Sequence, residues 1–218
     1  MSGPTVLVLA KAPVAGRAKT RLAATTGDEV AADLAAAALL DTLAAVAATP
    51  GARGLLALDG DLAEAARGPA IRAALEGWRV VPQRGEDFAE RLVAAHVDAG
   101  HGPVVQVGMD TPQLTPALLL GALDDLGDRD ACLGPADDGG WWVLARRDPG
   151  VAAPLARVPM STSTTYDDTV AALRGAGHAV ATTAALNDVD TVADAAEVAR
   201  TAPTTLFAAA FRGWEERS

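Results

Sequence analysis

Short apolar segments alternate with longer segments of helical spacing along most of this chain. Strands are predicted at residues 5–10, 54–60, 78–83, 103–108, 131–136, 141–145 and 178–183, and helices at residues 28–48, 62–76, 86–99, 115–126 and 191–200. This alternation predicts an α/β fold with a mainly parallel sheet, right-handed crossovers and helices on both faces. A chain of 218 residues suits one such domain, so we expect residues 1–218 to form a single domain.

The composition is that of a folded globular protein. Half of the residues are apolar and 21% are charged, which is far from the composition of a disordered chain. The formal net charge of −10 argues against nonspecific binding to nucleic acid or to an anionic membrane, because both need a broad basic surface. An anionic partner must therefore meet positive charge at one place.

The sequence also favours a cytoplasmic protein. Cys132 is the only cysteine, so no intramolecular disulfide can form, and no Cys/His cluster has the spacing of a zinc site. The apolar run at residues 5–10 is too short for a signal core. The Ala-rich run at residues 30–48 is interrupted by Asp33 and Asp41, so we expect a soluble helix there and no membrane partner. The oligomeric state stays open.

Positive charge is concentrated near the N-terminus. The first 27 residues hold Lys11, Arg17, Lys19 and Arg21 but no acidic residue, and these two lysines are the only lysines of the chain. Gly16 would let the backbone approach a ligand closely. Because the segment follows a predicted buried strand, we expect it to bind the phosphates of a nucleotide, although a solvated basic turn would have the same composition. Neither GxxxxGK[ST] nor GxGxxG is present.

Aspartates stand at two further loops of the expected ligand edge. Asp110 ends the apolar segment VQVGMD, and Asp188 and Asp190 precede the helix at residues 191–200. Aspartate caps turns and helices well, so one of the last two could be the N-cap. We favour a second role as ligands of Mg²⁺, which needs only one or two carboxylates besides phosphate oxygens.

Two other segments carry polar residues whose roles are ambiguous. Asp137 to Gly140 precede Trp141 and Trp142, where glycine allows close backbone approach and one tryptophan is expected to pack in the core. QRGEDFAERL at residues 83–92 is a charge run of the kind that usually forms a solvated helix start. The three histidines form no triad with a nucleophile, so we assign them no chemistry.

Taken together, KAPVAGRAKTRL, QRGEDFAERL, GMDTP, GPADDGGWW and DVDT resemble a bacterial glycosyltransferase-like family, sometimes labelled arsenosugar biosynthesis glycosyltransferase, of the GT-A nucleotide-diphospho-sugar transferase superfamily. RAKTRL is also similar to a segment of the 2-phospholactate guanylyltransferases. The resemblance implies a single-domain GT-A (Rossmann-like) fold and a Mg²⁺ or Mn²⁺ ion. The sequence departs from the family pattern at two positions. Gly108 stands where many GT-A glycosyltransferases have the first aspartate of a DxD motif, which leaves a single aspartate, as in nucleotidyltransferases. Trp141 stands in place of the usual tyrosine.

The residues and this resemblance together define the expected site. The residues expected in catalysis are Lys19, Arg21, Asp110 and Asp138. The residues expected to bind the nucleotide are Lys11, Pro13, Gly16, Arg17, Lys19, Arg21, Arg84, Gly108, Gly139 and Gly140. The residues expected to bind the metal are Asp110, Asp188 and Asp190, of which Asp190 is favoured over Asp188 by the resemblance.

Three functions remain open at this stage. The first is nucleotidyl transfer from an NTP to a small phosphorylated or phosphonate acceptor with release of pyrophosphate, in which the protein positions and neutralises the phosphates. The second is glycosyl transfer from a nucleotide sugar, with a carboxylate near residues 137–140 as base. The third is a noncatalytic nucleotide-binding module. We favour the first, because the basic loop suits a leaving pyrophosphate.

Overall fold

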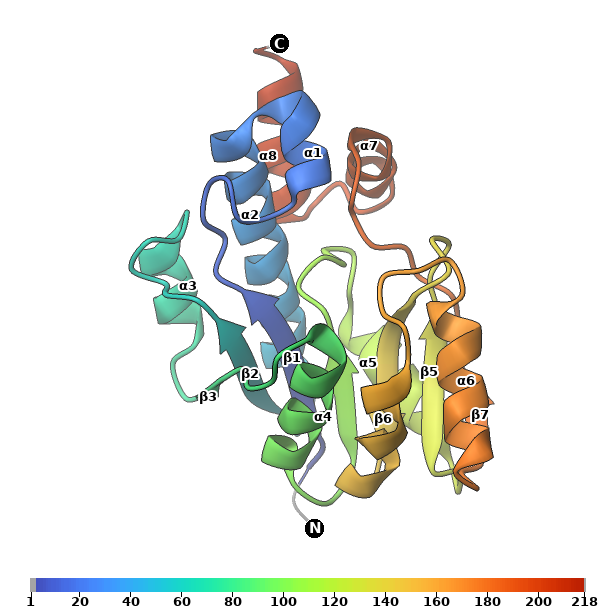
Figure 1. Cartoon of the computed structure of the whole chain (residues 1–218). Coiled ribbons are helices and arrows are strands. Elements are labelled where there is room, and N and C mark those ends of the chain that lie inside the picture. Colours follow the sequence, from blue (N-terminus) through green and yellow to red (C-terminus); the bar gives the residue numbers. More distant parts are fainter. Residues whose placement is uncertain (1–2, 218) are drawn as a thin grey trace.

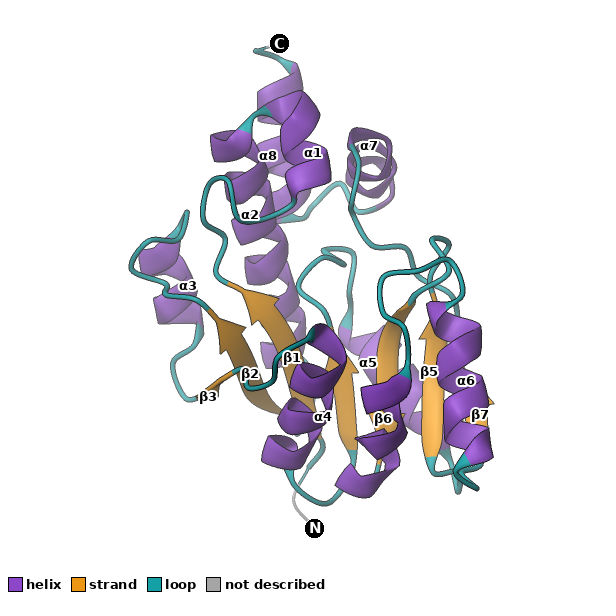
Figure 2. Cartoon of the chain, viewed as in Figure 1, coloured by secondary structure: helices purple, strands orange, loops and turns teal. Residues whose placement is uncertain are grey.

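The computed structural model describes residues 3–217, which form one seven-stranded sheet with helices on both faces (Figure 1, Figure 2). The strand order is β3-β2-β1-β4-β6-β5-β7. The strands are β1 (Thr5–Lys11), β2 (Arg53–Asp59), β3 (Arg79–Pro82), β4 (Val104–Val107), β5 (Ala131–Pro135), β6 (Trp141–Arg146) and β7 (Val180–Thr182).

The sheet is mainly parallel, which confirms the predicted fold class. Strands β3, β2, β1 and β4 are parallel to one another, β6 is antiparallel to both β4 and β5, and β7 is parallel to β5. Val107 at the end of β4 pairs with Val143 near the start of β6. The carboxyl ends of β1, β2 and β4 and the amino end of β6 therefore meet at one edge of the sheet.

Helices cover both faces of this sheet. On one face, Leu39 of α2, Ile71 of α3 and Leu119 of α5 belong to a single apolar cluster. On the other face, Leu92 of α4 and Leu155 of η1 are buried in neighbouring clusters. The helices are α1 (Thr20–Thr26), α2 (Asp28–Ala47), α3 (Gly68–Ala74), α4 (Phe88–Ala99), α5 (Pro116–Leu126), the 3-10 helix η1 (Pro149–Arg157), α6 (Thr165–Gly175), α7 (Val192–Thr201) and α8 (Leu206–Glu215).

The long Ala-rich helix α2 packs inside the fold. Its length and composition would allow it to span a membrane, but 67% of its apolar 18-residue window is buried in the protein, as expected of a core helix. The carboxylate of Asp33 accepts hydrogen bonds of 2.7 and 2.6 Å from Arg67. The carboxylate of Asp41 accepts from the backbone N–H groups of Leu206 and Phe207 at the start of α8. Both aspartates that interrupt the apolar run thus have partners.

A second group of helices lies beyond the carboxyl edge of the sheet (Figure 1). Helices α1 and α8 pack on α2, and α7 packs on α1 and α8; their shared apolar cluster buries Leu22, Leu34, Phe207 and Phe211. Val189, which lies between two candidate aspartates, belongs to the same cluster. Burial of Leu22 and Val189 on this common base holds the basic loop and the DVDT segment next to each other.

Several elements differ from the sequence-based expectation. Helices α1, η1, α6 and α8 were not predicted, and the helix expected at residues 62–76 is limited to α3. Asp61 accepts a hydrogen bond from the backbone of Ala63, and Arg67 adopts a left-handed conformation (φ 51°), so residues 61–67 form turns instead of a helix. Helix α6 contains polar residues at most of its positions, so it lacks a strong apolar period.

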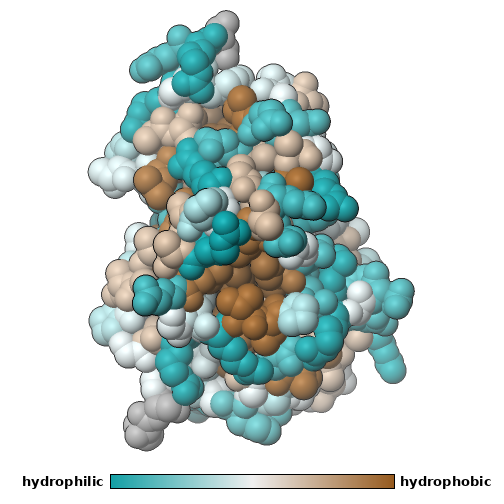
Figure 3. Space-filling view, turned by 90° about the vertical axis from the view of Figure 1, so that its left-hand side faces the viewer, coloured by the Kyte–Doolittle hydropathy of each residue, from teal (hydrophilic) through white to brown (hydrophobic). Residues whose placement is uncertain are grey.

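The edge strand β3 is partly open to solvent. Val80 of this strand is 46% exposed. Seen from this side of the molecule, an apolar hollow is surrounded by polar side chains (Figure 3).

Candidate functional site

A cleft of about 600 Å³ lies at the carboxyl edge of the sheet. Its wall combines the basic loop, the ends of β2 and β4, the start of β6, the first turns of α4 and residues 160–163 before α6. Open α/β sheets bind ligands at this edge, and the volume is typical of a small-molecule site. The charged residues in the wall are Lys11, Arg17, Lys19, Arg21, Asp59, Arg91, Asp110, Asp138, Asp188 and Asp190.

Lys19 links the basic loop to the two acidic loops. Its Nζ donates hydrogen bonds to Asp110 Oδ2 at 2.9 Å and to Asp190 Oδ1 at 2.7 Å. The Lys19 backbone has a left-handed conformation (φ 48°) directly before α1, which is unfavourable for a residue with a side chain. Burial alone would lower the pKa of the ammonium, but the two carboxylates outweigh this effect and raise the pKa above its ordinary value. Lys19 is therefore charged.

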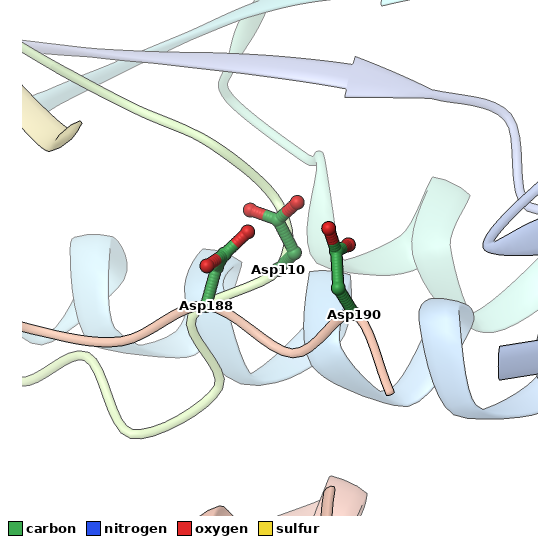
Figure 4. Close-up of side chains that lie close together, drawn as sticks. All are labelled: Asp110, Asp188 and Asp190. Carbon is green, nitrogen blue, oxygen red and sulfur yellow. The ribbon is translucent and has the colours of Figure 1, made fainter. Parts of the chain in front are cut away.

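Three carboxylates gather beside this ammonium. One oxygen each of Asp110, Asp188 and Asp190 lies within 4.8 Å of the others, and the side chains project into a common space (Figure 4). Burial, followed by the negative charges of Asp110 and Asp190, raises the pKa of Asp188 to about 6. Burial acts in the same direction on Asp190, but Lys19 and Arg21 outweigh it and lower that pKa. The three carboxylates repel one another, and a bound cation would reduce this repulsion.

The N-terminal cap of α7 does not use the side chains of Asp188 and Asp190. The N-cap of α7 is Thr191, whose hydroxyl accepts from the backbone N–H of Asp194, while the Asp194 carboxylate accepts from the backbone N–H of Thr191. Neither Asp188 nor Asp190 therefore caps the helix, which corrects the alternative that one of them does. The residue between them donates its backbone N–H to the carbonyl of Asp110 at 2.9 Å, which fixes the two acidic loops together.

The absence of a side chain at Gly108 leaves space for the Asp110 carboxylate. A Cβ atom added at Gly108 would lie 2.6 Å from Asp110 Oδ1, so any side chain there would displace this carboxylate. The first aspartate of a DxD motif at this position would therefore require the Asp110 side chain to change its conformation. Gly108 itself lines the cleft.

The basic loop brings all four of its cations to the cleft. Lys11, Arg17 and Arg21 line it, and Arg21 donates a 3.1 Å hydrogen bond to Asp190 Oδ2. Pro13 and Gly16, which were also expected at the nucleotide, are not in the cleft wall. Gly16 instead provides the positive φ of 74° that the loop requires, so its role is to shape the backbone.

The DDGG turn separates its two aspartates. Asp137 exchanges hydrogen bonds with Asn187, at 2.7 and 3.1 Å, and thereby faces away from the cleft wall. Asp138 lines the cleft and accepts a 2.7 Å hydrogen bond from the backbone N–H of Gly140, which also lines it. Gly139 is outside the wall. A Cβ atom on Gly139 would lie 2.1 Å from a backbone oxygen of residue 163, so this glycine allows the turn to pack on the loop before α6.

The two tryptophans lie on opposite faces of the sheet, as neighbouring residues of a strand do. Pairing between β5 and β6 shifts after Gly134, which leaves Trp142 as an extra residue on β6. Trp142 is 3% exposed and packs over Gly134 with the cluster that contains α2 and α5. Trp141 lies on the α4 side, where its Nε1 donates to Thr169. Both tryptophans line the cleft, and Trp142 is the buried one.

The structure does not bring Arg84 to the cleft. Its guanidinium makes two hydrogen bonds to the Asp98 carboxylate, at 2.8 and 3.0 Å, on the outside of α4. Arg91, seven residues further along and inside α4, lines the cleft instead. The charged run at residues 83–92 is thus only partly a solvated helix start: Arg84 precedes the helix and is bound to Asp98, whereas Arg91 is on the helix face that borders the cleft.

Several cleft residues were not proposed from the sequence. They are Asp59 at the end of β2, Gln106 within β4, Arg91, and residues 160–163. Asp59 has the same signal as Asp110, an aspartate at the end of an apolar strand, and could have been found in the same way. A glutamine inside the apolar segment PVVQVG was also a detectable signal, because a buried polar side chain needs a partner.

The histidines remain outside the chemistry. His96 is fully buried, and its Nδ1 accepts a 3.2 Å hydrogen bond from Arg146 Nε. Burial, assisted by the positive charge of Arg146, lowers the pKa of His96 to about 3. A neutral histidine that orients a buried arginine has a structural role.

Comparison with known proteins identifies relatives of the chain. Residues 42–162 match the model of a family described as "uncharacterized protein conserved in bacteria (DUF2064)". No curated protein matches. Among solved structures, a "putative nucleotide-diphospho-sugar transferase" from Desulfovibrio desulfuricans G20 is 30% identical, with a TM-score of 0.83 over 99% of this chain and 96% of that one.

More distant structures share the fold alone. CMP:2-keto-3-deoxy-manno-octonic acid synthetase in complex with CTP is 15% identical, with a TM-score of 0.55 over 93% of this chain and 99% of that one. Rv0371c of Mycobacterium tuberculosis H37Rv in complex with manganese is 24% identical, with a TM-score of 0.53 over 91% of this chain and 99% of that one. The chain thus has the fold of the nucleotide-diphospho-sugar transferases.

Proposed function

We propose that this chain, which belongs to the bacterial family DUF2064, is a metal-dependent transferase that uses a nucleotide. The group that it transfers is a nucleotidyl group, and the acceptor is a small phosphorylated or phosphonate molecule. The observation that carries this proposal is the contact of Lys19 with both Asp110 and Asp190 inside one cleft. A lysine held between two carboxylates places a positive charge where phosphate and a divalent cation would meet.

The basic loop is suited to a triphosphate. Lys11, Arg17 and Arg21 line the cleft around Lys19, and Lys11 has no carboxylate partner among the residues that the structure describes. The ion pair of Arg17 with Glu64 is exposed and 3.9 Å long, so it holds that guanidinium only weakly. The Lys11 and Arg17 side chains can therefore turn to phosphate oxygens at little cost in free energy.

The three aspartates fit a hard divalent cation. Their carboxylate oxygens are the ligands that Mg²⁺ and Mn²⁺ prefer, and the 4.8 Å limit on their separation allows one ion to be shared. The Lys19 ammonium already stands between two of them as a cation. When bound, the ion would supply positive charge to the oxygens of the reacting phosphates. Manganese in a distant structure with the same fold is consistent with such a site.

The chain's own groups would act mainly by positioning and charge. An acceptor oxygen attacks the α-phosphorus, the bond from that phosphorus to the bridging oxygen breaks, and pyrophosphate leaves. Lys19 and Arg21 would neutralise the charge that develops on the leaving group. Asp138, which is exposed in the cleft wall, would receive the acceptor proton when the acceptor is protonated. An NTP donor and a single cysteine are consistent with action in the cytoplasm.

Glycosyl transfer is the second candidate, and two observations bear on the choice. The 30% identical relative is named for a nucleotide-diphospho-sugar substrate, which favours glycosyl transfer. Glycine at position 108, in place of the first aspartate of a DxD motif, favours nucleotidyl transfer. We give more weight to Gly108, because it concerns the atoms of the site itself.

One experiment separates the candidate functions. The protein is incubated with each NTP or nucleotide sugar, Mg²⁺ and a pool of small metabolites, and the released nucleotide product is identified. Release of pyrophosphate supports nucleotidyl transfer, and release of a nucleoside diphosphate supports glycosyl transfer. Binding of nucleotide without either product would leave a noncatalytic module and refute both.

A further inference from the structure

Three residues of the cleft wall, Arg91, Gln106 and Thr111, have a buried side-chain atom without a hydrogen-bond partner, and the first two have the longest polar side chains. Gln106, in the middle of β4, is 3% exposed, and its Oε1 accepts no hydrogen bond. It pairs in register with Leu7 and Leu144 and lies on the α4 face of the sheet, so its surroundings are apolar. Buried side-chain amides in folded proteins are nearly always hydrogen-bonded. Since Gln106 borders the cleft, the missing partner can come from a ligand.

Arg91 is the second of these side chains. Its Nε is buried without a hydrogen-bond partner, and in the described part of the chain no carboxylate lies within ion-pair distance of its guanidinium. By contrast, Arg67 and Arg84 each have an aspartate partner. The buried Arg146 also lacks a carboxylate but donates to His96 and to backbone carbonyl groups, whereas Nε of Arg91 has no partner of either kind. An anionic group of a ligand would provide that partner.

The surrounding wall suits a small polar molecule. Met160 and Trp141 pack against the α4 side of the sheet and form its apolar part. Ser161 and Ser163 are exposed, line the cleft and can donate hydroxyl hydrogen bonds. Gly139 holds this loop in place, since any side chain at that position would collide with it.

We propose that this half of the cleft is an acceptor subsite, in which Arg91 binds an oxyanion of the acceptor and Gln106 binds an uncharged hydrogen-bonding group. This inference rests on the proposed function and names the class of acceptor: a small molecule with a phosphate, phosphonate or carboxylate group and at least one hydroxyl or amide. The subsite adds no chemical step. It orients the acceptor towards the donor phosphates at Lys19 and Asp110, which line the same cleft.

The experiment measures binding of four probes to the full chain by calorimetry. Glycerol 3-phosphate, 2-hydroxyethylphosphonate and glycerate carry the three oxyanions, and glycerol is the neutral control. We expect the oxyanion probes to bind more tightly than glycerol, and the preferred one identifies the group. Arg91→Met should weaken that binding about 10- to 100-fold, the loss of one or two charge-assisted hydrogen bonds, while Arg91→Lys should recover part of it. Gln106→Leu should weaken it less.

Arg84→Met is the matched control, because it removes an arginine of the same segment that lies outside the cleft wall. The subsite is wrong if no oxyanion probe binds, if Arg91→Met binds the probes as the unmodified chain does, or if Arg84→Met has an equal effect. It is also wrong if Arg91→Met weakens NTP binding as strongly as a Lys19 variant does, since Arg91 would then belong to the donor side. Failure of the proposed function is seen separately, as absence of product from any NTP with binding of the probes intact.

Discussion

Replacing Lys19 by methionine tests the central contact of the site. The substitution keeps the length and the apolar stem of the side chain but removes the ammonium that contacts Asp110 at 2.9 Å and Asp190 at 2.7 Å. A charge-assisted hydrogen bond contributes about 1.5–3 kcal/mol. Because both carboxylates are about 30% exposed and solvent replaces part of the loss, we expect a destabilisation of about 2–3 kcal/mol without metal. For a chain of this size the melting temperature should fall by roughly 5–10 °C.

The same substitution should strengthen the binding of metal. In the unmodified chain, an ion shared by Asp110 and Asp190 must displace Lys19 from at least one of them. Losing one such hydrogen bond costs about 1.5–3 kcal/mol, so Lys19→Met should bind Mn²⁺ about 10- to 100-fold more tightly, while its affinity for NTP falls. Added Mn²⁺ should then restore the melting temperature.

Calorimetry with Mn²⁺ and thermal unfolding with and without the ion measure both effects. Arg21→Met is the control, because it removes the same charge from a side chain that is 71% exposed and should change stability by less than about 1 kcal/mol. Equal Mn²⁺ affinity in Lys19→Met and the unmodified chain would refute the idea that the ammonium holds the place of the cation.

Three further predictions concern other parts of the molecule. Asp110→Asn should abolish pyrophosphate release from the best NTP while circular dichroism stays unchanged, because it keeps the shape of a proposed metal ligand and removes its charge; retained turnover would eliminate that role. Stability should fall below pH 6.5 by up to about 1.4 kcal/mol per pH unit, because the unfolded chain protonates His96 near pH 6.5 whereas the folded protein does so only near its lowered pKa of about 3. Urea unfolding at pH 7, 6 and 5 measures this slope, and an equal slope in His96→Gln would contradict it. Nucleotide or acceptor should quench the fluorescence of Trp141. Trp141→Phe should lose this response and Trp142→Phe should keep it; the reverse result would contradict the assignment to Trp141.

Features that depend on neighbouring residues could be predicted from the sequence. The strands were located by their apolar character, and the α5 helix by Thr115 and Pro116, which cap and begin it in the structure. Asp110 was placed at the ligand edge because a parallel strand delivers its last residue there. These inferences succeeded because strand burial, helix capping and the direction of a parallel strand are set within a few residues of sequence.

Only the tertiary structure determined which charged groups meet. Lys19 contacts Asp110 and Asp190 across 91 and 171 positions of sequence, and this contact depends on α1 and α7 packing on a common apolar cluster. Arg84 and Arg91 have the same charge seven positions apart. Arg84 lies before α4 and binds Asp98 outside the cleft, whereas Arg91 lies within α4 and lines the cleft. A charged side chain takes the partner that folding brings within reach, and no local pattern records that distance.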